Sequence, residues 1–158
     1  DGIRDKLVTG VQTCALPIFY FIEEVKSFIT HPSPGLKMNG PGYYEISGIA
    51  FSGEGRITRV DVSADGGKTW ARAELQTPVL DKSFTRFRIP WHWDGSPATL
   101  QSMAWDNKGN RQPTRAQFVA HRGQLQKELP PTAFPNQHFN GVTSWGIATS
   151  GEVTHVYA

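Results

Sequence analysis

Apolar and polar residues alternate with a period of two along much of this chain. In residues 86–93, RFRIPWHW, every second side chain is apolar or aromatic. Successive side chains of a β-strand point to opposite faces, so this pattern predicts a strand with one apolar and one polar face. Pro90 has no N–H to give to a neighbouring strand, which places it at a sheet edge or at a bulge.

Short runs of the same kind recur through the chain, separated by clusters of Gly, Pro, Asn and Asp. Further strands are expected at 21–30, 43–51, 58–63, 70–75, 98–105, 115–120, 144–149 and 153–157. Turn signals about every 8–12 residues are typical of an all-β sandwich. Residues 129–135, LPPTAFP, predict a stiff connector before a short final segment.

The segment 63–70, SADGGKTW, joins two of these strands and resembles the Asp-box motif S-x-D-x-G-x-T-W. We expect the Asp65 carboxylate to accept N–H groups across the turn while Trp70 packs beneath it. The motif residues are Ser63, Asp65, Gly67, Thr69 and Trp70. Asp-boxes occur in sialidase-like propellers and in other β folds. One copy predicts a structural hairpin, because a propeller needs several blades.

Composition excludes several classes of protein. The 158 residues are 38% hydrophobic and 19% charged, and 16 Lys and Arg against 14 Asp and Glu give a net charge of +2. This charge is too close to neutral to favour a nucleic acid or a membrane surface as partner. The longest apolar stretches are about half of the roughly 20 residues that a membrane-spanning helix needs, so no membrane span is expected.

Residues 1–18, DGIRDKLVTGVQTCALPI, differ in character from the rest of the chain. Residues 1–5 and 8–18 resemble the translation of a sequencing-library adapter, with Lys6 and Leu7 in the place of its index. The alternative is a secretory signal, but its apolar core would be interrupted and would lack a small-residue cleavage site. We therefore expect an adapter-derived segment, which removes Cys14, the one cysteine, from consideration as a ligand or nucleophile. The true N-terminus would then be missing, and residues 19–158 would be the tail of a longer protein.

The chain contains no recognisable catalytic or metal-binding motif. It lacks the nucleophile elbow, the phosphate-binding loop and the dinucleotide fingerprint, and no carboxylate pair suggests glycoside chemistry. Its histidines do not have the spacing of a zinc or iron site. They are His31, His92, His121, His138 and His155. We expect neither a catalytic residue nor a metal ligand in this chain.

Three segments taken together resemble a known family: residues 43–75, 84–95 and 100–113, beginning with YYEISGIAFSG, FTRFRIPWHW and LQSMAWDNKG. They are similar to the C-terminal dimerisation domain of the sulfite oxidase family of molybdenum enzymes. Within that family they look closest to the bacterial sulfite or sulfane dehydrogenase subunit of thiosulfate-oxidising systems. Arg122-Gly123 and residues 138–145 continue the likeness.

The resemblance implies an immunoglobulin-like β-sandwich of about seven strands over residues 26–158, with 19–25 as the remnant of an interdomain linker. It implies that an upstream domain binds the molybdopterin cofactor through a cysteine thiolate and oxidises a sulfur compound. It also implies a homodimer formed through this domain, a c-type cytochrome as electron acceptor and a periplasmic location. This chain alone would then be inactive.

The resemblance also directs attention to four residues. Some relatives place a basic residue of this domain in the anionic substrate pocket, and the matching segment 137–140, QHFN, has no arginine. His138 and Arg122 are therefore the candidates for contact with substrate. Arg86 and Arg88, on the polar face of their strand, are candidates for the dimer or interdomain interface.

Two alternatives remain open on the sequence. The chain could be a free-standing binding module, immunoglobulin-like or carbohydrate-binding, with tryptophans exposed for stacking on sugars. It could also be part of an Asp-box glycosidase, although the single motif copy disfavours this. A binding module predicts an exposed aromatic platform and a monomer, whereas a dimerisation domain predicts a broad symmetric self-interface.

Overall fold

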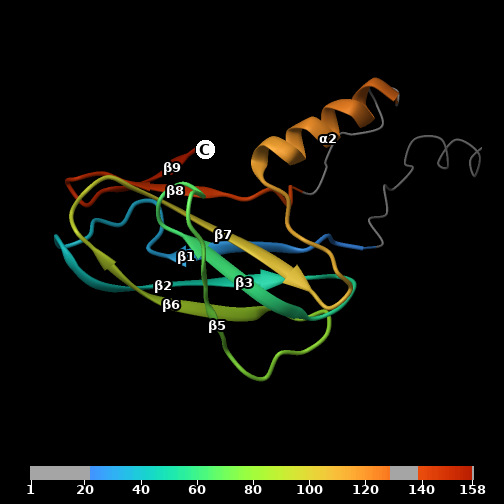
Figure 1. Ribbon diagram of the computed structural model, residues 1–158, viewed down its shortest axis with the longest axis horizontal. Coiled ribbons are helices and arrows are strands. Elements are labelled where there is room, and N and C mark those ends of the chain that lie inside the picture. Colours follow the sequence, from blue (N-terminus) through green and yellow to red (C-terminus); the bar gives the residue numbers. More distant parts are fainter. Residues whose placement is uncertain (1–21, 129–138, 158) are drawn as a thin grey trace, which may run out of the picture.

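The strands of the computed structural model, which describes residues 22–128 and 139–157, form two antiparallel sheets (Figure 1). One sheet has the order β1-β2-β6-β5 and the other β4-β3-β7-β8-β9. The strands are β1 Lys26–His31, β2 Gly42–Phe51, β3 Ile57–Ser63, β4 Ala71–Arg72, β5 Glu74–Leu75, β6 Thr85–Trp93, β7 Ala98–Asp106, β8 Ser144–Ile147 and β9 Val153–Val156. Seven of these described strands have four residues or more, which confirms the predicted all-β sandwich.

The alternating pattern of residues 86–93 is the reason for the central pairing of the first sheet. β6 pairs with β2 along its whole length, from Gly42 opposite Trp93 to Ala50 opposite Thr85. Phe87 and Trp93 are buried against the second sheet, and Arg88, Pro90 and His92 between them are exposed. β5 reaches only as far along β6 as Arg88. Pro90 therefore lies where the outer edge of β6 is unpaired in the described structure, as its missing N–H predicts.

The buried core contains a polar contact between the sheets. Gln112 is fully buried, and its Oε1 accepts hydrogen bonds from the backbone N–H of Ser27 at 2.9 Å and from the Ser27 hydroxyl at 2.7 Å. Its Nε2 donates to the carbonyl oxygens of Ser27 at 3.1 Å and Gly141 at 3.4 Å. Gln112 thus fixes β1 against the segment that precedes β8. A buried amide with all its partners satisfied is worth more than its bonds counted singly.

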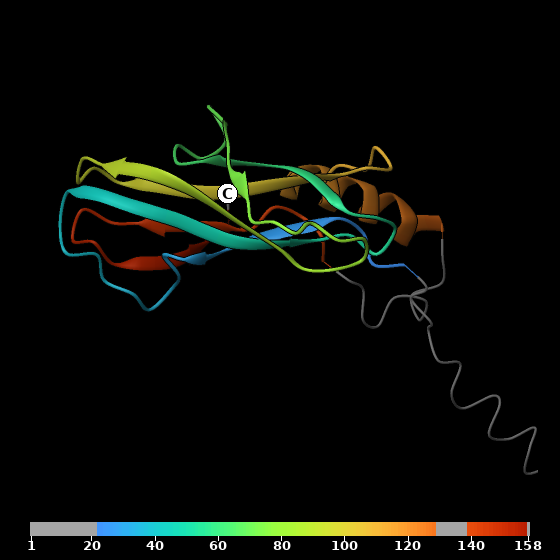
Figure 2. The same ribbon diagram turned by 90° about the horizontal axis from the view of Figure 1, so that it is seen from below.

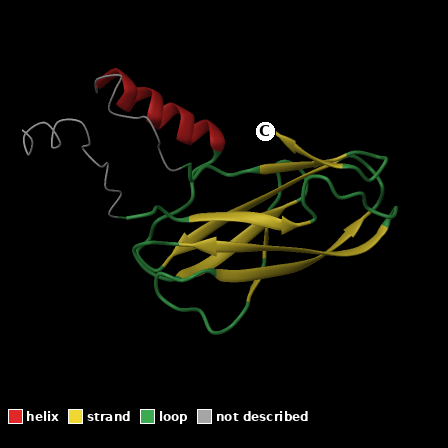
Figure 3. Ribbon diagram, turned by 180° about the vertical axis from the view of Figure 1, so that it is seen from behind, coloured by secondary structure: helices red, strands yellow, loops and turns green. Residues whose placement is uncertain are grey.

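The strand predicted at 115–120 is wrong, because these residues open a helix, α2 Arg115–Glu128, which extends past one end of the sandwich (Figures 1, 2 and 3). The helix begins with a capping box: the Thr114 hydroxyl accepts the N–H of Gln117 at 3.2 Å, and the Gln117 side chain accepts the N–H of Thr114 at 3.0 Å. This reciprocal pair satisfies N–H groups that a helix start leaves without partners. The first predicted strand also begins later, at Lys26, and the connector 129–135 lies outside the described residues.

Candidate functional site

Part of the outward side of the five-stranded sheet is covered by other segments of this chain. Met103 and Gln101 point outward from β7, yet both are buried. They line a hollow with Gly67 and Trp70 of the Asp-box turn and with Ala116 at the start of α2. The Asp-box turn and the start of α2 therefore cover this face around Met103 and Gln101.

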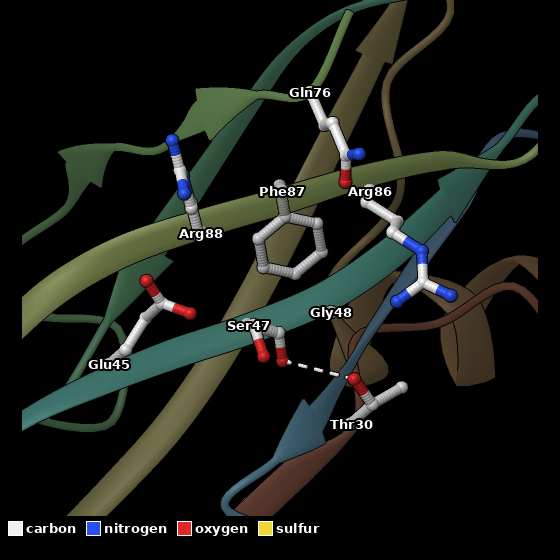
Figure 4. A pocket seen from close by; sticks show the side chains of 8 residues that line it. All are labelled: Thr30, Glu45, Ser47, Gly48, Gln76, Arg86, Phe87 and Arg88. Atoms are coloured by element: carbon white, nitrogen blue, oxygen red, sulfur yellow. Dashed lines mark hydrogen bonds between the residues drawn. The ribbon is translucent and has the colours of Figure 1, made fainter.

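The outward side of the four-stranded sheet is open. Arg86 and Arg88 extend from β6, and Glu45 and Ser47 extend beside them from β2 (Figure 4). With Gln76 and Thr30 they border a shallow hollow of about 190 Å³ above the Gly48–Phe87 pair. We call this set the polar strip: Thr30, Glu45, Ser47, Gln76, Arg86 and Arg88. The two arginines that the sequence singled out thus share one exposed face.

Charges of both signs lie in the polar strip. The Arg88 guanidinium is 3.3 Å from the Glu74 carboxylate, and this hydrogen bond, with a smaller contribution from Glu45, raises the pKa of Arg88. Both partners of this ion pair are well exposed, so it contributes little to stability. In the described part of the chain, Arg86 and Glu45 have no ion-pair partner. The strip therefore holds a cation and an anion that a docking surface could match.

An apolar hollow adjoins the polar strip on the same face. It has a volume of about 190 Å³ and is lined mainly by Phe28, Ile49, Phe51 and Phe84. The Phe84 ring is 69% exposed and lies 5.3 Å, centroid to centroid, from the Phe51 ring. Burial lowers the pKa of the nearby Lys26 amine, an effect that Glu23 partly offsets. An exposed aromatic cluster beside charged groups has the composition of a protein–protein interface.

The Asp-box residues form a closed set of hydrogen bonds inside the turn. The Asp65 carboxylate accepts the N–H groups of Lys68 and Thr69, each at 2.9 Å, and the Thr69 hydroxyl at 2.6 Å. The Ser63 hydroxyl donates to Asp65 at 2.7 Å, and Trp70 Nε1 donates to the Gly67 carbonyl at 2.9 Å. Both carboxylate oxygens of Asp65 thus accept hydrogen bonds from within the turn, which supports a structural role for this residue.

The two substrate-pocket candidates cannot be placed relative to each other. His138 lies outside the described residues. Arg122 belongs to α2, but its side chain is likewise outside the described part. Both stay predictions.

Glu45, Gln76 and Phe84 are residues of this face that sequence reasoning missed. The alternation in β2 was visible, and it puts Glu45 and Ser47 on one face. Its alignment against β6 was not visible, because register depends on the loop between the strands and on packing. Once Glu45 is opposite Pro90 and Ile49 opposite Arg86, the composition of the face follows.

The described residues do not offer a site for molybdenum. That metal calls for a soft thiolate ligand, and the one cysteine, Cys14, is outside the described part. No group of three or more His, Cys, Asp or Glu side chains that could hold a metal is found within residues 22–128 and 139–157. In the same ranges, no helix is long and apolar enough to cross a membrane.

An exposed tryptophan platform, which a carbohydrate-binding module would present, is not found. All five tryptophans lie in the described part, and none is exposed. They are Trp70, Trp91, Trp93, Trp105 and Trp145. Trp105, for example, is stacked under the guanidinium of Arg59, whose carbon is 4.8 Å from the ring centroid.

Comparison with known proteins gives a consistent result. Residues 20–128 match the family model of the Mo-co oxidoreductase dimerisation domain. The chain is similar to the sulfite oxidase of Gallus gallus, with 50% identity over 52 residues, which is 32% of this chain and 11% of that protein. It is also similar to the NAD(P)H nitrate reductase of Hordeum vulgare, with 33% identity over 81 residues, 46% of this chain and 9% of that protein. The matches thus span about a tenth of these curated relatives.

A solved structure matches over most of the chain. The crystal structure of the sulfane dehydrogenase SoxCD from Paracoccus pantotrophus superposes with a TM-score of 0.71 and 42% sequence identity. The match covers 85% of this chain and 33% of the other.

Proposed function

Because the chain belongs to the Mo-co oxidoreductase dimerisation domain family, we propose that it pairs two copies of a molybdenum enzyme that oxidises an inorganic sulfur compound. The match of the family model to residues 20–128 is the observation that carries this proposal. In this role the domain performs no chemistry. It holds two catalytic domains together through a surface of its own.

Sedimentation equilibrium of the 158-residue chain, over a wide range of protein concentration, tests the pairing. A reversible monomer–dimer equilibrium is expected, since an interface of ordinary size buries about 1,600 Å² in total. A chain that stays monomeric at every concentration contradicts the proposal.

The sulfur substrate is favoured by the extent of the likeness. The sulfane dehydrogenase structure is 42% identical to this chain and the Gallus gallus sulfite oxidase is 50% identical over 52 residues, whereas the barley nitrate reductase is 33% identical over 81 residues. From the family resemblance we also propose a c-type cytochrome as electron acceptor and a periplasmic location. The choice between sulfite and sulfane sulfur is left to the catalytic domain.

The longer protein would carry the molybdopterin cofactor in an upstream domain, where a cysteine thiolate suits the metal. In this proposal residues 1–18 derive from adapter DNA, residues 19–25 are the end of the linker, and residues 26–158 are the dimerisation domain. Long-read sequencing of the source DNA across the codon for Phe19 tests the division. The reading frame should continue upstream of Phe19 into a domain with such a cysteine. Genomic DNA that encodes residues 1–18 as printed contradicts it.

His138 and Arg122 remain the candidates for contact with an anionic sulfur substrate. A bound dianion favours protonated His138, because an opposite charge stabilises the imidazolium. In the full enzyme, His138→Ala should raise KM and leave kcat nearly unchanged. Unchanged KM removes His138 from the pocket.

A further inference from the structure

We infer that a second copy of this chain docks on the outward face of the β1-β2-β6-β5 sheet, with Arg86 of each copy beside Glu45 of the other. The inference rests on the proposed function and adds to it the surface and the contacts. Three observations support it: the openness of this face, its aromatic cluster, and the arrangement of its charges.

The first observation is the contrast between the two faces of the sandwich. Met103 and Gln101 point outward from β7 and are buried beside the Asp-box turn and the start of α2. Outward-pointing residues of β2 and β6, such as Glu45 and Arg86, are exposed. The outward face of β2 and β6 is therefore accessible to another molecule without rearrangement of this chain.

The second observation is that large apolar groups are exposed on this same face. Phe84 is 69% exposed at one end of it and Tyr43 is 86% exposed at the other. Tyr43 lies edge-on to His92, with ring centroids 4.8 Å apart. Aromatic and arginine side chains in one patch are the residues that contribute most of the binding energy at protein interfaces.

The third observation is that a twofold rotation brings the positive group of one copy level with the negative group of the other. Arg86 is opposite Ile49 and Glu45 is opposite Pro90, so the two charges lie two residues on either side of Ser47 along β2. The twofold axis of this dimer would lie between the two faces, at right angles to the strands and level with Ser47. Rotation about it reverses the strand direction and brings each Arg86 level with the other copy's Glu45. Arg88, level with the axis, already has Glu74 as its partner, which limits repulsion between the two Arg88 side chains. A second copy therefore meets Arg86 and Glu45 of this face at once, as a C2 interface requires.

Exchange of the two charges provides the test. In the 158-residue chain, Arg86→Glu alone places two acidic pairs across the interface, and Glu45→Arg alone places two basic pairs there. Each variant should raise the dimer Kd at least about tenfold, since like charges at an interface are strongly unfavourable. An equimolar mixture of the two variants should recover a heterodimer with a Kd near that of the wild type. Arg72→Glu, an exposed arginine on β4 of the other sheet, is the matched control and should leave Kd unchanged.

The outcomes separate the two proposals. A wild-type chain that never dimerises overturns both the proposed function and this inference. A wild-type dimer that both charge variants leave intact overturns the inference alone, because the chain then pairs through another surface. Two weakened variants whose mixture does not recover also overturn it, because the effect is then not reciprocal.

A cross-link provides a second measurement that does not depend on charge. Stacked sheets lie about 10 Å apart, so the two Ser47 positions near the axis are within reach of a short bismaleimide. On a Cys14→Ser background, Ser47→Cys should yield a covalent dimer, and Arg72→Cys should yield none. Equal cross-linking of the two variants overturns the placement of the axis.

Discussion

Asp65 illustrates how one carboxylate can organise a turn. Its oxygens accept four hydrogen bonds, the longest 2.9 Å, from residues no more than four positions away. The hydroxyl of Thr69 contributes most, followed by the Thr69 N–H and the Ser63 hydroxyl, and together they hold the pKa of Asp65 well below its usual range. Each of these bonds favours the charged form of the carboxylate.

Asp65→Ala should therefore lower the Tm of the chain by several degrees near neutral pH. A carboxyl whose pKa is depressed on folding stabilises the fold above its unfolded pKa, about 4, and this stabilisation is lost as the pH falls through the folded value. The difference in Tm between wild type and variant should be constant from about pH 5 to pH 7 and should shrink below about pH 4. Thermal unfolding followed by circular dichroism measures it, with Asp81→Ala, in an exposed loop, as the control. A difference that does not change with pH contradicts the assignment.

The motif around Asp65 could be recognised in the sequence because all the hydrogen-bond partners of the Asp65 carboxylate are close to it along the chain. Six residues of SADGGKTW make the hydrogen bonds, so the spacing alone fixes the geometry. Gln112 had no such signal. Its partner Ser27 lies 85 positions away, and only the packing of the two sheets brings them together.

At the scale of elements, β2 depends on a glycine in its middle. Gly48 is opposite Phe87, and a Cβ placed on Gly48 would be 2.3 Å from both the Phe28 carbonyl oxygen and Phe87 Cζ. β1, β2 and β6 can pack as they do only because this position has no side chain. Neither contact was evident from the sequence, where Gly48 stands in an ordinary strand pattern.

Gly48→Ala should destabilise the chain by about 1–3 kcal/mol, the usual cost of an added group in a filled core. Urea unfolding measures the loss. Ser47→Ala, the neighbouring residue on the open face, is the matched control and should stay within about 0.5 kcal/mol of the wild type. Equal effects of the two substitutions would refute the packing argument.

The same scale explains where strand prediction failed. Residues 115–120, RAQFVA, show apolar and polar positions that a short strand also allows. The capping box of Thr114 and Gln117 was present in the sequence and is a stronger signal than this alternation, because the spacing of the two residues predicts both of their reciprocal hydrogen bonds. β6 was predictable because residues 86–93 alternate strictly, and no helix could bury that pattern on one side.

At the scale of the molecule, the sandwich was predictable and the identity of its open face was not. Both sheets have outward-pointing polar residues, and both carry arginines. The difference between them arises from coverage: the Asp-box turn and the start of α2 lie on one sheet and leave the other exposed. Which face is covered depends on where segments distant in the sequence pack against the sheets, and a local sequence pattern does not specify this.

A dimer formed through the open face should respond separately to salt and to loss of aromatic surface. Raising the salt from about 0.1 M to about 1 M shortens the screening length from about 10 Å to about 3 Å, which weakens the Arg86–Glu45 contacts and should raise the wild-type Kd several-fold. Phe84→Ala should raise Kd about tenfold at every salt concentration, because it removes apolar contact and no charge. Val119→Ala, on α2 and 56% exposed, is the control and should change neither. Sedimentation equilibrium at two salt concentrations measures all three chains. If the wild-type Kd does not change with salt, or if the effect of Phe84→Ala disappears at high salt, the polar strip and the apolar hollow do not form one interface.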